Sequence, residues 1–199
     1  MVDVWVPYGK TEICARIPTR NYLGNIEPKE KQGAKDPKAE VTRALAEPIG
    51  SKRLGELLKP GNKIAIVVDD HTRSTPTHLI VPPILEELSM VGIPDSDITI
   101  VFGTGTHRPP KPEEQKAILG EDVLRRIRVT SHNYRAKDLV YLGRTKSHLN
   151  KVYVNKVFAE ADFRILTNSI ELHYFAGYGG GRKSVLPAVT GEETIQHNH

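Results

Sequence analysis

Cysteine is nearly absent from this sequence, because Cys14 is the single one in 199 residues. A disulfide within the chain and a zinc site built from several cysteines are therefore excluded. The sequence also lacks an apolar run close to the ~20 residues that span a membrane. Its first residues lack the basic and apolar regions of a secretory signal peptide. These absences favour a cytoplasmic protein in a reducing compartment, with no membrane partner.

The sequence also lacks a large excess of positive over negative residues. The 28 lysine and arginine residues exceed the 24 acidic residues only slightly, for a net charge of +4. They do not form the clustered basic stripe that nucleic-acid binding needs, so we expect no nucleic-acid partner. The small positive excess permits an anionic ligand. Hydrophobic residues make up 38% of the chain, which is enough for a core and excludes a disordered chain.

A continuous apolar run, Ile64–Val68, predicts a strand that is buried on both faces, and Ile98–Phe102 predicts a second buried strand. A polar loop and then a helical pattern follow each strand. The first pattern covers residues 77–91, and the second forms two helices, 112–119 and 121–127, that Gly120 separates. This alternation is typical of an α/β fold with a parallel or mixed sheet, flanking helices and right-handed crossovers, as in Rossmann-like domains. Further strands are expected at residues 139–142, 152–154 and 163–166.

The first part of the chain predicts smaller elements. Residues 4–17 indicate two short strands joined by a turn at 8–10, and residues 19–35 indicate an exposed polar connection. Asp36 followed by proline is typical of a helix start. A second short helix is expected over residues 54–58.

Chemically active side chains follow both buried strands, at the sheet edge where α/β proteins bind ligands. After the first strand, Asp70 and Arg73 stand three residues apart in the segment 69–76. Together they can hold a hydroxyl and an anion, since arginine binds a carboxylate or phosphate through two hydrogen bonds. The alternative is structural: a capped turn that leads into a helix and contains a local Asp–Arg ion pair.

The loop after the second strand combines two glycines with a histidine in the order Gly103-Thr104-Gly105-Thr106-His107-Arg108. Glycines let the backbone approach a ligand closely. An imidazole exchanges a proton near neutral pH, which makes His107 a candidate acid/base catalyst. The alternative is a glycine-rich loop with a surface histidine.

The most specific segment is both glycine-rich and basic, Gly179-Gly180-Gly181-Arg182-Lys183-Ser184. It is similar to a Walker phosphate loop but fails that motif, because Arg182 separates the last glycine from the lysine. The loop can still bind phosphate through backbone N–H groups. Neighbouring positive charge lowers the pKa of Lys183 toward a nucleophilic amine. The alternative is a flexible loop with solvated charges.

Two histidines, His197 and His199, alternate at the C-terminal end of the sequence. Imidazole is a good ligand for nickel, copper or zinc, but no neighbouring cluster offers the remaining ligands. A metal held mainly by a bound cofactor, with one histidine as a further ligand, fits this pattern better than a metal site built by the protein. A frayed polar tail is the alternative.

These motifs occur in one order along the chain. They are Asp70 with Arg73, the loop 103–108, His173 ten positions before Lys183, the loop 179–184 and the terminal His197-Asn198-His199. Together they closely resemble the nickel-dependent lactate racemase family. The resemblance implies that residues 1–199 form an N-terminal cofactor-binding α/β domain, and that the second α/β domain of the family lies beyond this chain. The isolated domain is then expected to be inactive.

The resemblance implies a nickel pincer nucleotide, built from nicotinic acid mononucleotide, as the cofactor. In the family a lysine of the glycine-rich loop carries this group through a thioamide, which implies Lys183. A later histidine completes the nickel coordination, which implies His199, with His197 as the second choice. Separate enzymes make the cofactor, so these enzymes are implied partners and the protein can also exist without it. The other implied cofactor-binding residues are Asp70, Arg73, Gly179, Gly180, Gly181, Arg182 and Ser184.

The implied reaction is the racemisation or epimerisation of a 2-hydroxy acid, such as lactate, through a 2-keto acid. A base removes the hydroxyl proton while the cofactor accepts a hydride. Two opposed histidines, here His107 and His173, serve the two enantiomers. The alternative function is a nucleotide- or phosphate-binding module that uses the glycine-rich loop without covalent chemistry. A metal hydrolase fits less well, because the ligand spacing of such sites is missing.

Overall fold

The protein is described by a computed structural model for residues 1–27, 29 and 31–198. The chain divides into two compact units, Met1–Ala34 and Lys35–His199. The expectation that residues 1–199 form one cofactor-binding domain stays a prediction, because compactness does not report cofactor binding. Among the described helices, none combines the length and the apolar character that a membrane crossing requires.

The first unit is built around a β-hairpin. Strand β1, Val2–Tyr8, pairs antiparallel with strand β2, Thr11–Ile17, and Gly9 occupies the turn with a φ of 62°. A short 3-10 turn, η1, follows at Thr19–Asn21. The two strands expected within residues 4–17 are therefore confirmed. None of the described residues of this unit is buried, so the unit has no core of its own.

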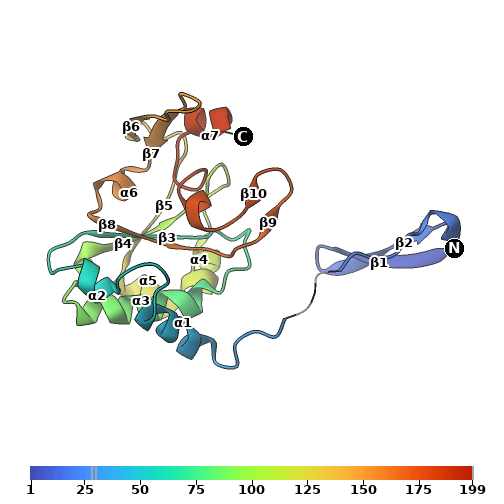
Figure 1. Ribbon diagram of the computed structural model, residues 1–199, viewed down its shortest axis with the longest axis horizontal. Helices are drawn as coiled ribbons and strands as arrows, with labels where there is room; N and C mark the ends of the chain where they lie inside the picture. Colours follow the sequence, from blue (N-terminus) through green and yellow to red (C-terminus); the bar gives the residue numbers. More distant parts are fainter. Residues whose placement is uncertain (28, 30, 199) are drawn as a thin grey trace. The chain divides into compact units, whose positions relative to one another are not determined.

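A parallel sheet of four strands forms the centre of the second unit (Figure 1). All three neighbouring pairs of strands run parallel. Every residue of its central strand β3 is buried, as a continuous apolar run predicts. The expected α/β fold with flanking helices is thereby confirmed. The strands in spatial order are β5 (Arg128–Ser131), β4 (Ile98–Phe102), β3 (Ile64–Val68) and β8 (Phe163–Thr167).

One face of the sheet is covered by five helices, which bury the larger core (Figure 1). Ile66 and Ile100 of the sheet pack there with Leu85 and other apolar side chains of the helices. Asp36 caps the first helix as expected, since its carboxylate accepts the N–H of Ala39 at 3.0 Å. The elements are α1 (Pro37–Ala46), α2 (Leu54–Leu57), α3 (Thr77–Met90), α4 (Pro112–Leu119), α5 (Glu121–Arg126) and the 3-10 turn η2 (Asp95–Asp97).

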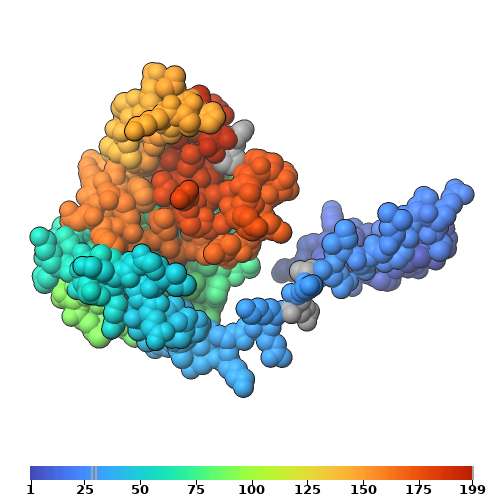
Figure 2. Space-filling view, in the orientation of Figure 1, coloured from blue at the N-terminus to red at the C-terminus, as the bar shows by residue number. Residues whose placement is uncertain are grey.

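The opposite face is covered by later parts of the chain, drawn in orange and red in Figure 2. Val67 and Val101 of the sheet pack on this side with Val154, Phe158 and Val189. The remaining elements are β6 (Val140–Arg144), β7 (Lys151–Val154), α6 (Lys156–Glu160), β9 (Leu172–His173), β10 (Gly177–Tyr178), the 3-10 turn η3 (Gly181–Ser184) and α7 (Glu192–Asn198).

Two of the expected strands lie outside the central sheet. Those near residues 139–142 and 152–154 are β6 and β7, which pair antiparallel as a separate two-stranded sheet. The short antiparallel pair β9–β10 and the edge strand β5 were not expected. Strand β5 contains one large apolar residue, Val129, so no apolar run marks it.

The strand order creates a topological switch point at β3. After β3 the chain moves to β4 and then outward to β5, and it later returns to place β8 on the other side of β3. Loops that leave the carboxyl ends of β3 and β8 therefore diverge, and α/β proteins bind ligands in such crevices. The motif-bearing segments 69–76, 103–108 and 168–180 begin at the carboxyl ends of β3, β4 and β8.

Candidate functional site

A cavity of about 430 Å³ opens at the carboxyl ends of β3, β4 and β8. Its walls are the loops after β3 and β4, the segment after β8 that contains the β9–β10 hairpin, and the turn η3. The fold thus gathers side chains from positions 69 to 195 around one space. The sequence-predicted residues that line it are Asp70, Arg73, His107, His173, Gly179, Gly180 and Lys183.

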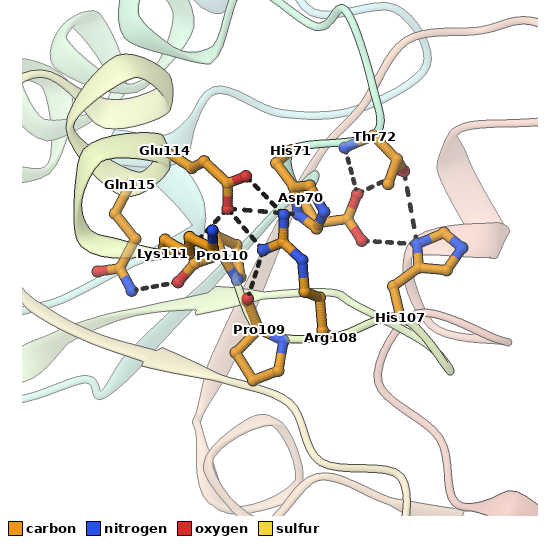
Figure 3. A network of polar contacts seen from close by, with 10 residues as sticks. All are labelled: Asp70, His71, Thr72, His107, Arg108, Pro109, Pro110, Lys111, Glu114 and Gln115. Carbon is orange, nitrogen blue, oxygen red and sulfur yellow. Dashed lines mark hydrogen bonds and ion pairs between the residues drawn. The ribbon is translucent and has the colours of Figure 1, made fainter.

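Asp70 and His107 interact across two neighbouring strand ends (Figure 3). The Nδ1 atom of His107 lies 2.7 Å from Oδ2 of Asp70, a residue that is only 3% exposed. The other carboxylate oxygen accepts the backbone N–H and the hydroxyl of Thr72, at 2.9 and 2.6 Å. An ionised carboxylate only accepts hydrogen bonds, so this contact keeps a proton on Nδ1 of His107 and leaves Nε2 for proton transfer.

The surroundings of Asp70 keep it ionised. Burial alone raises the pKa of the Asp70 carboxyl, but hydrogen bonds from Thr72 and from His107 outweigh burial and hold the pKa below its usual value. The alternative of a local Asp70–Arg73 ion pair is not found among the described residues. Arg73 gives only its backbone N–H to the Asp70 carbonyl, at 3.3 Å. Asp70 therefore orients His107, while its implied contact to a cofactor stays a prediction.

Asp69 joins the end of β3 to the end of β8. Its carboxylate accepts hydrogen bonds from the hydroxyl of Thr75 and from the side-chain amide of Asn168. The Thr75 hydroxyl also accepts the backbone N–H of Ser169 at 3.1 Å. The sequence analysis missed Thr75, Asn168 and Ser169. The signal that could have found the last two is their position directly after an expected strand.

Lys183 places its ammonium group in the cavity wall. Its Nζ atom is buried and has no hydrogen-bond partner among the described residues. Burial lowers the pKa of Lys183, and the positive charge of Arg73 lowers it further. The direction agrees with the expectation, but the causes are burial and Arg73 rather than the neighbouring Arg182. Such a lysine loses its proton more easily than a solvated one and becomes a nucleophilic amine.

The glycine-rich turn before Lys183 fits closely against the segment after β8. The N–H of Gly179 donates to the Glu171 carbonyl at 2.6 Å, and the N–H of Lys183 donates to the Gly180 carbonyl at 3.0 Å. These two amides are therefore not free to bind phosphate. Gly180 has φ 73° and ψ −179°, a conformation that is essentially restricted to glycine. A Cβ atom at this position would lie 2.7 Å from the carbonyl oxygen of Ser169.

His173 reaches the cavity from strand β9, between two aromatic rings. The Tyr174 ring stacks on it at a centroid distance of 4.9 Å, and the Phe175 ring meets it edge-on at 4.6 Å. Nδ1 of His173 accepts the N–H of Ala176 at 3.2 Å, so the neutral ring carries its proton on Nε2. Neutral His107 therefore offers an acceptor at Nε2, whereas neutral His173 offers a donor there.

The segment after Lys183 is fixed by two other elements. The N–H of Gly105 donates to the Ala188 carbonyl at 2.9 Å. Nε2 of the buried His132 lies 2.8 Å from the Thr190 carbonyl, which can only accept, so this nitrogen carries a proton. Burial lowers the pKa of His132, and the hydrogen bond to Thr190 only partly offsets the change. His132 is thus neutral, and its hydrogen bond to Thr190 holds the segment that follows Lys183.

Three residues predicted to bind the cofactor, Gly181, Arg182 and Ser184, are not among the described residues that line the cavity. Their cofactor contacts stay predictions. Arg108, next to His107 in sequence, binds Glu114 through two hydrogen bonds of 2.7 and 2.6 Å (Figure 3). This pairing lowers the pKa of Glu114 to about 2. Arg108 is therefore engaged outside the cavity.

The predicted nickel ligand His199 lies outside the described residues. His197, the second choice, lies on α7, where Nε2 donates to the His148 carbonyl at 2.9 Å. In the part of the chain that the structure describes, no group of three or more His, Cys, Asp or Glu side chains could hold a metal ion. A metal bound chiefly by a cofactor would need fewer ligands from the protein, so this expectation stays a prediction.

The cavity suits a covalently attached, negatively charged group. Lys183 offers a buried amine with a lowered pKa. Arg73 lines the same space, and it takes part in none of the ion pairs between described residues. Its guanidinium is therefore available to a carboxylate or phosphate. The arrangement can attach a ligand at Lys183, hold negative charge at Arg73 and accept a proton at His107.

Comparison with known proteins points to one family. A family model described as the lactate racemase N-terminal domain matches residues 8–199. The chain is 38% identical to a lactate racemase from Lactiplantibacillus plantarum and 33% identical to one from Thermoanaerobacterium thermosaccharolyticum. Both matches cover the whole chain and 47% of the relative. The chain thus spans about half the length of the curated relatives that it matches.

Solved structures agree with this result. The lactate racemase apoprotein from Thermoanaerobacterium thermosaccharolyticum matches with a TM-score of 0.79 and 32% identity, over 98% of this chain and 45% of that one. A protein from Thermotoga maritima, 23% identical, matches with a TM-score of 0.62 over 81% of this chain and 39% of its own, and shares the fold. The resemblance inferred from the motifs is confirmed: this chain belongs to the lactate racemase N-terminal domain family.

Proposed function

We propose that the full-length protein containing this chain racemises a 2-hydroxy acid, lactate or a related compound, and that this chain supplies the cofactor-binding half. One observation carries the proposal. The buried ammonium of Lys183, which has no hydrogen-bond partner among the described residues, lines the same cavity as two histidines, His107 and His173. A nucleophilic amine beside two imidazole rings, which can accept and donate protons, is the set of side chains that such an enzyme needs. Both curated relatives carry the name lactate racemase.

The cofactor we propose is a nickel pincer nucleotide attached to Lys183. The lowered pKa of Lys183 favours the free amine, which is the form that makes a covalent bond. Arg73 lines the same cavity, and we assign to it the phosphate of the nucleotide or the carboxylate of the substrate. When bound, the group supplies the hydride acceptor that interconverts a 2-hydroxy acid and a 2-keto acid. His199 is the proposed nickel ligand.

The protons are moved by the chain's own side chains. Nε2 of His107 accepts the proton of the substrate hydroxyl, and the Asp70 carboxylate 2.7 Å from Nδ1 stabilises the imidazolium that forms. Nε2–H of His173 donates a hydrogen bond to the substrate oxygen in the same state. For the opposite enantiomer the two histidines exchange these roles, which requires a proton to leave Nε2 of His173.

A second candidate function is that of a module that binds a nucleotide or phosphate without covalent chemistry. Such a module depends on free backbone N–H groups that can bind phosphate. In the glycine-rich turn the N–H groups of Gly179 and Lys183 already donate to carbonyls, which argues against this second function. The proposed partners are therefore a small hydroxy acid and the enzymes that make the cofactor. The proposed compartment is the cytoplasm.

Intact mass measurement of the full-length protein tests the proposal. The protein is produced together with the cofactor-making enzymes and nickel, in parallel with Lys183→Ala and with His107→Gln. We expect a mass increment of the nickel nucleotide on the wild type and on His107→Gln, and none on Lys183→Ala. Racemisation of a 2-hydroxy acid, measured with lactate and with related compounds, is expected only for the wild type. An increment retained in Lys183→Ala overturns the attachment site.

Nucleotide binding distinguishes the second function. Tight reversible binding of a nucleotide without nickel, unchanged in Lys183→Ala and with no covalent increment in any protein, would replace the racemase proposal by the binding module. A known racemase, loaded in the same cells, shows that the cofactor pathway works.

A further inference from the structure

The β1–β2 hairpin has one apolar and one polar face. Side chains of a strand alternate between faces, and directly opposed residues of an antiparallel pair share a face. Val4 opposes Ala15 and Val6 opposes Ile13 on one face. That face consists of Val2, Val4, Val6, Tyr8, Thr11, Ile13, Ala15 and Ile17. The other face, called the polar face here, carries the charged residues Asp3, Glu12 and Arg16 together with Trp5, Pro7 and Cys14, whereas the apolar face carries no charged residue.

The two faces differ in how their side chains interact with their surroundings. On the polar face Arg16 and Asp3 form an ion pair at 2.8 Å, with both side chains largely in water. On the apolar face Tyr8, Ile13 and Val6 are 66%, 45% and 43% exposed. The apolar face is therefore the one that calls for a covering surface.

The first unit cannot provide that surface. None of its described residues is buried, and its only other regular element is the 3-10 turn η1. A hairpin of two strands is at best marginally stable by itself in water. The hairpin, with seven residues in each strand, therefore depends on polypeptide outside residues 1–34.

We propose that the apolar face of the β1–β2 hairpin packs on the part of the full-length protein that lies outside the segment matched here. The match to the solved lactate racemase apoprotein leaves out 2% of the 199 residues, or about four, which is fewer than either strand contains. The hairpin region thus recurs in a chain of which 45% is matched, leaving more than half of that chain as the possible covering surface.

A covalently connected surface is favoured over a second copy of the protein. A tethered partner meets the hairpin at an effective concentration in the millimolar range, about a thousandfold above a protein in micromolar solution. The occupant is therefore an apolar surface within the same polypeptide. The hairpin would then act as a strap that ties the beginning of the chain to its second half, a role separate from the chemistry at Lys183.

Photo-cross-linking in the full-length protein tests this inference. The photoreactive residue p-benzoyl-phenylalanine replaces Tyr8 on the apolar face and, as the matched control, Trp5 on the polar face. Both positions hold exposed aromatic residues, at 66% and 62%. We expect the probe at Tyr8 to form bonds within one polypeptide, to peptides beyond the matched segment. The probe at Trp5 is expected to give less than about one tenth of that yield.

Three outcomes overturn the inference. They are cross-links from position 8 that join two copies of the protein, cross-links to residues 35–198, and equal yields at both positions. Absence of any cross-link from position 8 also counts against it, provided that the variant keeps the wild-type circular dichroism. If that variant does not fold, the probe moves to Ile13 on the same face and the same outcomes apply.

Discussion

The Asp70 carboxylate and the His107 imidazole lie 2.7 Å apart, although the two residues follow different strands of the sheet. The contact fixes which ring nitrogen of His107 carries the proton. It also places a negative charge where it stabilises the protonated ring. A carboxylate that orients a histidine in this way determines whether the other nitrogen can act as a base.

Asp70→Asn is expected to lower turnover of the full-length, cofactor-loaded protein by about 10²–10⁴-fold. An asparagine amide can donate to Nδ1 of His107 and so place the imidazole proton on Nε2, where it blocks proton uptake. The measurement is the racemisation rate together with the ¹⁵N chemical shifts of the His107 ring. Thr72→Val removes one hydrogen bond to Asp70 and a 3.4 Å contact to Nδ1 of His107, but it keeps the contact between Asp70 and His107, so it should cost less than about tenfold. Wild-type turnover in Asp70→Asn would contradict the role of Asp70.

Gly180→Ala is expected to destabilise the protein by about 3 kcal/mol. The backbone conformation at Gly180 is essentially restricted to glycine, and the new Cβ would lie 2.7 Å from the carbonyl oxygen of Ser169. Gly181→Ala is the matched control, because φ is also positive there, at 51°, but no atom lies within 4 Å of the added Cβ. We expect that control to cost about 1 kcal/mol. Urea unfolding measures both, and equal costs would refute the clash.

Asp69→Asn is expected to lower the free energy of unfolding by about 1–3 kcal/mol. The substitution turns an acceptor of two hydrogen bonds into a group with one acceptor oxygen, so either Thr75 or Asn168 loses its partner. The comparison is Asp122→Asn, the same chemical change in an ion pair with Arg125 whose side chains are 84% and 74% exposed. That change should cost less than about 1 kcal/mol. Similar values for both variants would show that the Asp69 contacts add nothing.

His132 predicts a pH dependence of stability. Its pKa in the folded protein is lowered by burial, so the unfolded chain binds more protons below about pH 6.5. The stability that His132 contributes is present above that pH and is lost as the pH falls. For one proton the loss is at most about 1.4 kcal/mol per pH unit. His132→Gln should flatten this slope in urea unfolding between about pH 5 and 7.

The control for this measurement is His148→Gln, which changes an exposed histidine and should keep the wild-type slope. A wild-type slope in His132→Gln would mean that other groups cause the pH dependence. The test compares the pH slope of the unfolding free energy between variant and wild type, because buried carboxylates such as Asp70 add their own pH dependence at low pH in both proteins.

The centre of the sheet could be predicted from sequence because β3, which is buried on both faces, is continuously apolar, and β4 is apolar except for the partly buried Thr99. Strand β5 could not, since it lies at an edge and three of its four residues are polar or charged. The antiparallel pairing of β6 with β7 could not be predicted either, because an apolar pattern indicates that a strand exists but not which strand it pairs with.

Part of the candidate site could be predicted as well. The positions of His107, Arg73 and Lys183 followed from strand ends and from a glycine-rich loop, and the cavity brings them together. The pairing of Asp69 with Asn168 could not be foreseen, since it joins residues 99 positions apart that only the sheet makes neighbours. The cause of the lowered pKa of Lys183 was missed for the same reason, because burial is a tertiary property.

The hydrogen bonds from Gly105 and His132 to the segment after Lys183 have a consequence for the reactivity of that lysine. Gly105 follows β4 and His132 follows β5, so the packing around Lys183 depends on strands that are remote from it in sequence. In a peptide of residues 176–190 the same lysine would be an ordinary solvated amine. Burial and the charge of Arg73 lower the pKa of Lys183 only when its segment is packed in the fold, so folding itself turns an ordinary lysine into a nucleophile.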